Sequence, residues 1–311
     1  MPENSGKRFK ILIINPNTST HMTDALKPIV AQLNYPDVHF DYFTAPTQTV
    51  TLPDGRVIEG IPSINSGEDS VKSAHHCRAF VEPLIPQYDA FLVACYSAHP
   101  LVGMLRATIG ALEAKARQQS PSDGAGSLPV LGGEFSSKRR RYVTGILEGS
   151  VSSSLMLISA FHLQGDRSLH KVQAQDTFGI VSTGAVWKPE LTTAVNAMLN
   201  GPEDKSAAAA ESSASRFAGV ETTGLTAIEL HETPADEVCK RMSDATARLL
   251  KNSSRPVRAV CLGCAGMAGM GEAVRAGCIQ AYGQVEGESV HIVDGVVAGV
   301  GLLVNACKAQ F

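Results

Sequence analysis

Two cysteines stand at positions where a thiol could take part in chemistry. Cys95 ends the apolar stretch DAFLVAC, residues 89–95, and Cys264 ends a second apolar stretch that begins at Val257. A cysteine can remove a proton as a thiolate and return one as a thiol, because its surroundings can tune its pKa toward the working pH. Two cysteines on opposite sides of one carbon atom therefore indicate racemisation, in which one sulfur takes a proton and the other delivers one to the opposite face.

Each cysteine also has a simpler interpretation. A single cysteine beside a histidine is typical of nucleophilic catalysis, and a free cysteine at a strand end is often a small buried apolar residue. Cys261 and Cys264 form a C-x-x-C pair, but structural zinc needs four ligands and the sequence has no second such pair, so we expect no bound metal. Several of the remaining cysteines are expected in the core, namely Cys239, Cys261, Cys278 and Cys307.

The chain around these cysteines alternates strands with helices. Residues 9–14, FKILII, predict a buried parallel strand, and the polar loop NPNTS that starts at Asn15 leads into a helix. Thr18 or Ser19 is placed to cap that helix. Further strands are expected at residues 89–95, 177–181 and 257–264. The pattern predicts an α/β fold in which mainly parallel sheets are flanked by helices.

The two halves of the chain repeat the same order of features. A strand that ends at Asn15 is followed 80 residues later by Cys95, and a strand that ends at Ser182 is followed 82 residues later by Cys264. A Gly-led polar segment that opens a helix lies between the members of each pair, GIPSINS in the first half and GVETTGL in the second. Ligands bind outside the carboxyl ends of the strands in open α/β sheets. We therefore expect two pseudo-symmetric lobes around a cleft, each with a cysteine at a helix N-terminus that favours the thiolate.

A polar segment marks the expected boundary between the lobes. Residues 116–127, ARQQSPSDGAGS, are rich in Gly, Ser and Pro, which is typical of a linker. The first lobe is predicted to span residues 1–120 and to be completed by a C-terminal helix in residues 291–311, and the second to span residues 128–290. The basic run KRRR at residues 138–141 is expected in a solvated loop, and the low-complexity residues 203–216 are expected to be exposed.

Charge and composition exclude several classes of partner. The formal net charge of −3 gives no reason for binding to nucleic acid or to an anionic membrane surface. No apolar stretch reaches the length of a membrane span. Seven cysteines, an odd number scattered over 311 residues, do not resemble the disulfide framework of a secreted protein. We expect a cytoplasmic protein that acts on a small molecule.

Four motifs together carry a family resemblance. NPNTS from Asn15, ACYSAHPL from Ala94, TTGLT from Thr222 and LGCAGM from Leu262 resemble the hydantoin racemase branch of the Asp/Glu/hydantoin racemase superfamily, and the fungal Dcg1-like proteins most of all. The resemblance implies two pseudo-symmetric α/β lobes with the active site in the cleft between them. It also implies that no cofactor is used and that Cys95 and Cys264 form the acid/base pair.

Departures from the superfamily's patterns bear on the substrate. Its amino-acid racemases follow their cysteines with Asn-Thr or Thr-His, where this chain has Tyr96-Ser97 and Ala265-Gly266. The difference implies a cyclic ureide, such as a 5-substituted hydantoin or allantoin, instead of a free amino acid. The residues expected to contact it are Asn15, Thr18, Ser63, Tyr96, His99, Thr222, Thr223, Ala265 and Gly266.

Other interpretations remain open at this point. His99 could instead be an ordinary helix-start histidine, or it could tune the Cys95 thiolate. The protein could be a related isomerase or decarboxylase that uses one cysteine, or a two-lobed binder of small molecules without catalysis. Residues 131–144 are expected to be an insertion relative to the family pattern, either a surface elaboration or a contact in a homo-oligomer.

Overall fold

The computed structural model describes residues 9–119, 127–130, 133–136, 139–158, 162–163, 172–173, 176–201 and 216–311. The described chain divides into two compact units. The first runs through Ile146 and includes Gly299–Phe311, and the second comprises Leu147–Ala298. Each unit contains a parallel sheet flanked by helices, as the alternation of strands and helices predicts.

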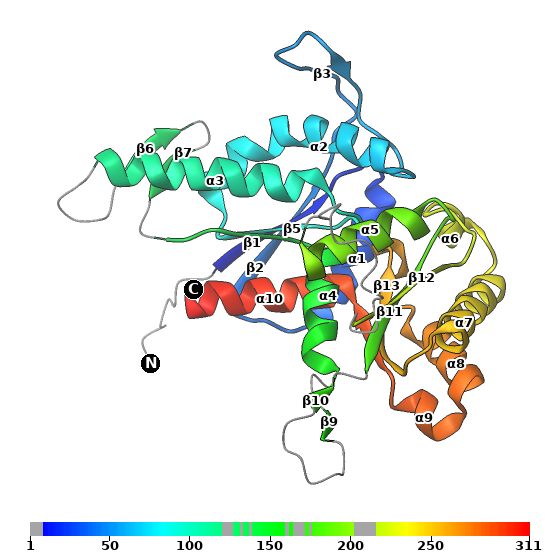
Figure 1. The fold of residues 1–311 in the computed structure, drawn as a ribbon. Coiled ribbons are helices and arrows are strands. Elements are labelled where there is room, and N and C mark those ends of the chain that lie inside the picture. The colour runs from blue at the N-terminus through cyan, green and yellow to red at the C-terminus, as the bar shows by residue number, and fades with distance from the viewer. Residues whose placement is uncertain are drawn as a thin grey trace, which may run out of the picture. The chain divides into compact units, whose positions relative to one another are not determined.

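A four-stranded parallel sheet forms the centre of the first unit, with the strand order β2-β1-β5-β8. Its strands are β1 (Phe9–Asn15), β2 (Val38–Thr44), β5 (Ala90–Val93) and β8 (Tyr142–Gly145). Its helices are α1 (Thr20–Gln32), α2 (Gly67–Val81), the 3₁₀ helix η1 (Glu82–Gln87) and α3 (Pro100–Gln119). Side chains alternate across a strand, so Leu12 and Ile14 pack on the same face as Phe91 and Val93, in one cluster with residues of α2 and α3. Figure 1 shows α2 and α3 on one side of these strands and α1 on the other.

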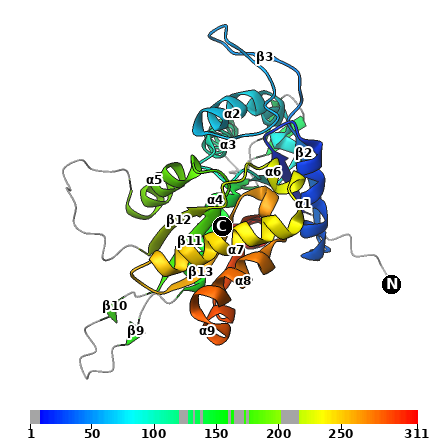
Figure 2. The ribbon, with the colours of Figure 1, turned by 90° about the vertical axis from the view of Figure 1, so that its right-hand side faces the viewer.

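The second unit repeats this arrangement with the strand order β12-β11-β13-β14, again with parallel pairings. Its strands are β11 (Thr177–Ser182), β12 (Phe217–Thr222), β13 (Val257–Gly263) and β14 (His291–Asp294). Its helices are α4 (Ile146–Leu157), α5 (Trp187–Asn200), α6 (Glu229–Glu232), α7 (Ala235–Asn252), α8 (Gly271–Tyr282) and α9 (Gln284–Glu288). Val181, Val260 and Leu262 pack against α7 and α8, which lie side by side over one face of the sheet (Figure 2).

Short strand pairs and a last helix lie outside the two sheets. Three two-stranded antiparallel pairs are described in addition to the two sheets. They are β3 (Val50–Thr51) with β4 (Val57–Ile58), β6 (Ser127–Val130) with β7 (Gly133–Ser136), and β9 (His162–Leu163) with β10 (Val172–Gln173). The last helix, α10 (Gly295–Ala309), follows β14. No helix in the described ranges is long and apolar enough to cross a membrane.

The division of the chain differs from the one predicted from the linker at residues 116–127. Strand β8 lies after that linker, yet it pairs with β5 and so belongs to the first sheet. Strand β14 pairs with β13 and so belongs to the second sheet, and only the residues of α10 from Gly299 onward join the first unit. The first boundary therefore lies at Ile146 and not near residue 120, and the last one lies at Gly299 and not at residue 291.

The predicted insertion at residues 131–144 is built into the first unit. Phe135 on β7 is fully buried, and the Arg141 guanidinium lies 4.0 Å from the centre of its ring. Arg141 Nε also donates to the Ile85 carbonyl at 3.1 Å, and Arg139 forms a 2.8 Å ion pair with Asp89. Two cations of the basic run are therefore anchored to the unit, which corrects the expectation of a solvated loop. Lys138 and residues 203–215 lie outside the described residues.

Candidate active site

The carboxyl end of β5 positions Cys95. This strand lies between β1 and β8, and the Ala94 N–H donates to the Ile14 carbonyl at 2.8 Å, which continues the ladder one step beyond the strand. Cys95 follows directly and is half-buried. The thiol therefore leaves the carboxyl end of a central strand, where α/β proteins place their ligands.

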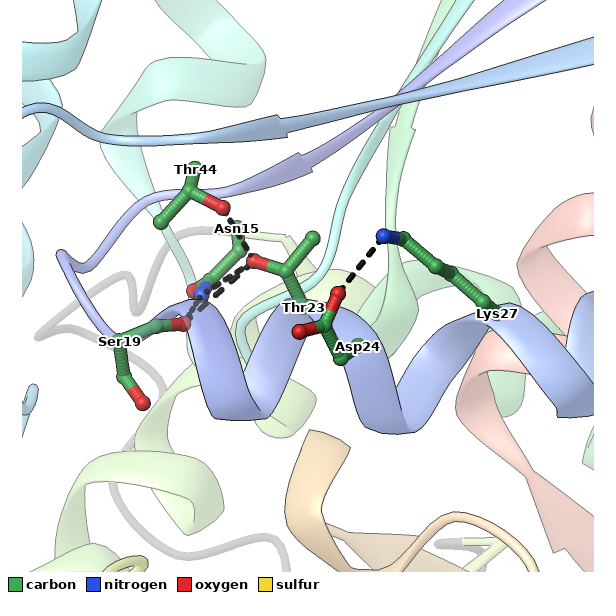
Figure 3. A network of polar contacts seen from close by, with 6 residues as sticks. All are labelled: Asn15, Ser19, Thr23, Asp24, Lys27 and Thr44. Carbon is green, nitrogen blue, oxygen red and sulfur yellow. Dashed lines mark hydrogen bonds and ion pairs between the residues drawn. The ribbon is translucent and has the colours of Figure 1, made fainter.

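A buried carboxamide organises the neighbouring loop between β1 and α1. Asn15 Nδ2 has three acceptors within reach of its two hydrogens, namely Asn17 Oδ1 at 3.0 Å, the Ser19 carbonyl at 2.9 Å and Thr23 Oγ1 at 3.0 Å, and Asn15 Oδ1 accepts from the Asn17 N–H. Figure 3 shows the Asn15 side chain directed into the first turn of α1, with Thr44 Oγ1 2.6 Å from Thr23 Oγ1. Asn15 is only 2% exposed, and these contacts give its amide a structural role in the loop; its contact with a ligand stays a prediction.

The same loop is joined to the segment that precedes α2. The Thr18 N–H donates to the Ile61 carbonyl at 2.9 Å. A Cβ atom at Gly60 would lie 2.2 Å from the Pro46 carbonyl oxygen. The backbone at residue 60 can approach Pro46 this closely only because residue 60 is a glycine. Ser63 is buried, and its hydroxyl donates to Asn65 Oδ1 at 3.2 Å. Thr18 therefore contacts the segment that carries Ser63, and both predicted site residues belong to the first unit. Ser19, not Thr18, caps α1.

His99 is used inside the first unit. Its Nε2 lies 2.8 Å from Ser73 Oγ, and its Nδ1 accepts the Leu101 N–H at 3.4 Å. Burial lowers the pKa of His99 to about 3, so the imidazole is neutral at physiological pH. Both ring nitrogens have protein partners, which favours the helix-start role over the expected substrate contact. Tyr96 is also buried.

Cys264 occupies the equivalent position in the second unit. It follows Gly263, the last residue of β13, and β13 lies between β11 and β14 as β5 lies between β1 and β8. The residue is half-buried, and its sulfur accepts the Gly266 N–H at 3.4 Å. Gly263 itself is confined, because a Cβ there would lie 2.7 Å from the Val181 carbonyl oxygen.

The electrostatic expectation for this cysteine is wrong. No α-helix begins at Cys264: a 3₁₀ turn, Ala265–Met267, follows it, and α8 starts only at Gly271. Burial raises the pKa of the Cys264 thiol to about 11, and the backbone N–H groups of Gly266 and Met267 lower it only in part. Burial therefore favours the thiol form of Cys264 at physiological pH. In the first unit, α3 likewise begins at Pro100 and not at Cys95.

The remaining predicted contacts of the second unit gather at the same end of its sheet. Thr222 ends β12, and the Thr223 N–H donates to the Ser182 carbonyl at 2.9 Å. Ser182 Oγ donates in turn to the Gly263 carbonyl at 2.7 Å, which ties the ends of β11 and β13 together. Ala265 and Gly266 are buried in the turn after the cysteine.

The surroundings of the other predicted core cysteines differ from those of Cys95 and Cys264. Cys261 is buried, with its sulfur 3.1 Å from Ser154 Oγ on α4, and Cys278 and Cys307 are buried as predicted. Cys239 is exposed on α7, which corrects its assignment to the core. Within the described part of the chain, no group of three or more His, Cys, Asp or Glu side chains could hold a metal ion.

Three buried serines near Cys95 were missed by the sequence reasoning. Ser70 and Ser73 lie on α2 and Ser97 follows the cysteine, and all three are buried. With the helix cap Ser66, the first two recur at intervals of four and three residues, which places them on one face of α2. A polar stripe on the buried face of a helix was the signal that could have identified them.

Comparison with known proteins connects this geometry to a family. The family model for Asp/Glu/hydantoin racemases matches residues 11–111 and 143–303, which include both cysteines. This chain belongs to the Asp/Glu/hydantoin racemase family. The match omits residues 112–142, which contain the β6–β7 hairpin.

Individual proteins are also similar to this chain. The uncharacterized protein C1F7.10 of Schizosaccharomyces pombe is 30% identical over 96% of this chain and 92% of its own length. Protein DCG1 of Saccharomyces cerevisiae is 29% identical over 31% of this chain and 38% of its own length, in line with the fungal resemblance. The crystal structure of allantoin racemase from Pseudomonas fluorescens shares the fold, with a TM-score of 0.62 and 19% identity over 97% of this chain and 92% of its own.

Proposed function

We propose that this family member is a cofactor-independent racemase of a cyclic ureide, with Cys95 and Cys264 as its acid/base pair. The observation that carries the proposal is the equivalence of the two thiols. Each follows the third strand of its unit's sheet, and each lies at the carboxyl end of a strand with a parallel neighbour on both sides. Two such thiols match the two proton transfers of racemisation, one for each face of the reacting carbon.

The proposed reaction moves one proton at each sulfur. The thiolate of one cysteine removes the proton from the ring carbon C5, and the electron pair of the C–H bond passes to the adjacent carbonyl as an enolate. The thiol of the other cysteine delivers its proton to the opposite face of C5 and becomes the thiolate. Backbone N–H groups near the sulfurs, such as that of Gly266, are donors for the developing oxyanion.

The substrate class follows from the polarity of the segments around the cysteines. Residues 15–19, 60–66, 94–99, 222–226 and 264–267 contain no Asp, Glu, Lys or Arg. A free amino acid carries a carboxylate and an ammonium group that need charged or strong polar partners when they are bound, whereas a hydantoin ring offers neutral N–H and C=O groups. A 5-substituted hydantoin or allantoin therefore fits best. The P. fluorescens structure of the same fold is an allantoin racemase.

The proposed ureide contacts lie at the carboxyl ends of the strands and in the segments beside them. They are Thr18, Ser63, Tyr96, Thr222, Thr223, Ala265 and Gly266. Asn15 and His99 support this set by fixing the loops after β1 and β5. A cytoplasmic location is part of the proposal, because the reaction requires both thiols in reduced form.

Proton NMR in D₂O tests the proposal directly. Each enantiomer of allantoin and of a 5-substituted hydantoin is incubated with protein, the loss of the C5–H signal and of optical activity is followed, and a buffer control corrects for spontaneous racemisation. The wild type exchanges the proton and racemises both enantiomers. Cys95→Ala and Cys264→Ala each lose racemisation by at least about 10²-fold, and each retains exchange with a different enantiomer through its remaining thiol. Cys239→Ala, which removes an exposed cysteine, is the matched control.

Two results would contradict the mechanism. If one cysteine variant keeps full activity, the protein uses a single cysteine, as an isomerase or decarboxylase would. Burial favours the protonated form of Cys264, which suits such a one-sided proton donor. If a ureide binds tightly but its C5 proton exchanges no faster than in buffer, the protein is a binder without catalysis.

A further inference from the structure

The Ser70 hydroxyl, in the first turn of α2, has two acceptors within reach. Its Oγ lies 3.2 Å from the Ser66 carbonyl oxygen and 3.3 Å from Ser97 Oγ. A hydroxyl carries one hydrogen, so Ser70 can donate to only one of the two at a time. The position of this hydrogen therefore defines two states of the network.

Ser97 connects Ser70 to the cysteine. Its Oγ lies 3.5 Å from Cys95 Sγ, and either atom can be the donor in this contact. Ser70 and Ser97 are only 3% and 5% exposed, so little water competes for these hydrogen bonds. The direction of the Cys95–Ser97 bond is thus coupled to the state of Ser70.

We propose that Ser70 and Ser97 form a hydroxyl switch that stabilises Cys95 in both of its protonation states. The inference rests on the proposed function, in which Cys95 must be a base toward one enantiomer and an acid toward the other. A partner that can only donate would favour the thiolate alone, and a partner that can only accept would favour the thiol alone. Two hydroxyl groups that rotate serve both states.

Each state of the switch has a defined set of hydrogen bonds. With Cys95 as a thiolate, Ser70 donates to Ser97 Oγ and Ser97 donates to the sulfur, so the two bonds polarise each other. With Cys95 as a thiol, Ser97 Oγ accepts the S–H while its own O–H rotates away from the sulfur, and Ser70 turns to the Ser66 carbonyl. No proton leaves either serine, because only the two O–H bonds rotate.

Neighbouring groups hold the switch in place without adding charge. Ser73 Oγ donates to the Ser70 carbonyl at 3.3 Å and accepts from His99 Nε2, the nitrogen that carries the hydrogen when Nδ1 accepts the Leu101 N–H. His99 is neutral at physiological pH. The two carboxylates in the first turn of α2 have partners of their own: Glu68 is ion-paired with Lys72, and Asp69 accepts the N–H of Asn65.

Cys264 has no equivalent of this device among its described contacts. Two residues after each cysteine, Ser97 in the first unit corresponds to Gly266 in the second. The Gly266 N–H reaches Cys264 Sγ at 3.4 Å, but a backbone N–H can only donate. The inference therefore assigns Ser70 and Ser97 as positioning residues for Cys95 alone.

The pH dependence of Cys95 alkylation tests the switch without any substrate. Iodoacetamide reacts with the thiolate, and mass spectrometry of the Cys95 peptide gives the rate at each pH. Ser97→Ala raises the apparent pKa of Cys95 by about one unit, since a hydrogen bond to a charged group is lost. Ser97→Thr keeps the hydroxyl and restores the wild-type profile. Ser70→Ala raises the pKa by a smaller amount, because Ser97 then lacks its donor.

One control variant and two possible results test whether the hydroxyl switch exists. Ser154→Ala also removes a buried serine beside a cysteine sulfur, that of Cys261, and leaves the Cys95 profile unchanged. If Ser97→Ala gives the wild-type profile, the inference fails. If Ser70→Ala has no effect while Ser97→Ala does, Ser97 acts alone and the switch is wrong. Alkylation needs no turnover, so failure of racemisation in the NMR experiment would refute the proposed function and leave this result standing.

Discussion

Asn15 offers the sharpest distinction between a ligand contact and a structural role. Its carboxamide makes four polar contacts, all within the loop between β1 and the first turn of α1. Substitution of Asn15 by alanine removes these contacts and leaves space where the carboxamide was. We expect this variant to lose stability in the first unit before any effect on ligand binding can be measured.

The size of the stability loss in Asn15→Ala depends on which of its neighbours keep another hydrogen-bond partner. Ser19 O still accepts from the Thr23 N–H, and Thr23 Oγ1 still pairs with Thr44 Oγ1. Asn17 Oδ1 still accepts from the Ser19 N–H, so the Asn17 N–H is the group that loses its acceptor. One buried donor without a partner costs about 1–3 kcal/mol, and the small cavity adds about 1 kcal/mol. The expected loss of unfolding free energy is therefore about 2–4 kcal/mol.

Urea unfolding followed by circular dichroism measures this loss, and hydrogen exchange of the peptide that contains residues 15–23 locates it. The control is Asn200→Ala, at the exposed end of α5 in the second unit, which should change the free energy by less than about 0.5 kcal/mol. If Asn15→Ala is as stable as this control and instead weakens ureide binding, the structural assignment of Asn15 is refuted.

Two further substitutions probe the strand ends and the buried histidine. Gly263→Ala places a Cβ 2.7 Å from the Val181 carbonyl and should cost about 2 kcal/mol in urea unfolding, whereas Gly184→Ala, where nothing lies within 4 Å, should cost little; equal losses would contradict the steric argument. His99, with its pKa lowered to about 3 by burial, stays neutral in the folded protein, while the unfolded chain binds a proton below about pH 6.5. Stability is therefore lost as the pH falls from 6.5 toward 3, by about 2 kcal/mol at pH 5. His99→Gln removes this contribution, so its unfolding free energy should fall less than the wild type's between pH 7 and pH 5, and an equal fall would count against a buried neutral histidine.

The strands that carry the cysteines could be predicted because their signal is local. A β-branched or apolar run that stops at a polar or small residue indicates a buried parallel strand and its end, which located Cys95 and Cys264 correctly. The division between the units could not be predicted in the same way. Tyr142–Gly145 is a four-residue strand, and nothing within it shows that it pairs with β5 and not with a strand of the second sheet. Linker composition shows where a chain is polar, but sheet membership depends on pairing between distant residues.

The roles of polar side chains at the strand ends were harder to predict for a related reason. Asn15 and His99 have the right residue type and position to contact a ligand, and the same properties suit them to hold a loop. The difference lies in which atoms their polar groups meet, and those atoms come from other elements: Thr23 on α1 for Asn15, and Ser73 on α2 for His99. The thiolate expected at Cys264 failed because burial, which depends on the whole unit, outweighs two nearby N–H groups.

The two cysteines share a topological position but not a chemical environment, and this difference has a consequence for the proposed mechanism. Cys264 is held as a thiol by burial, whereas Cys95 has a hydroxyl partner that can donate or accept. In the proposed mechanism, this difference favours Cys264 as the acid in the first proton transfer and leaves the base role to Cys95. The enantiomers of a ureide have equal free energies in water, so kcat/KM must be the same in both directions regardless of this bias. The asymmetry can therefore appear only as compensating differences in kcat and KM between the enantiomers, since the less populated protonation state binds its enantiomer at the cost of shifting a proton.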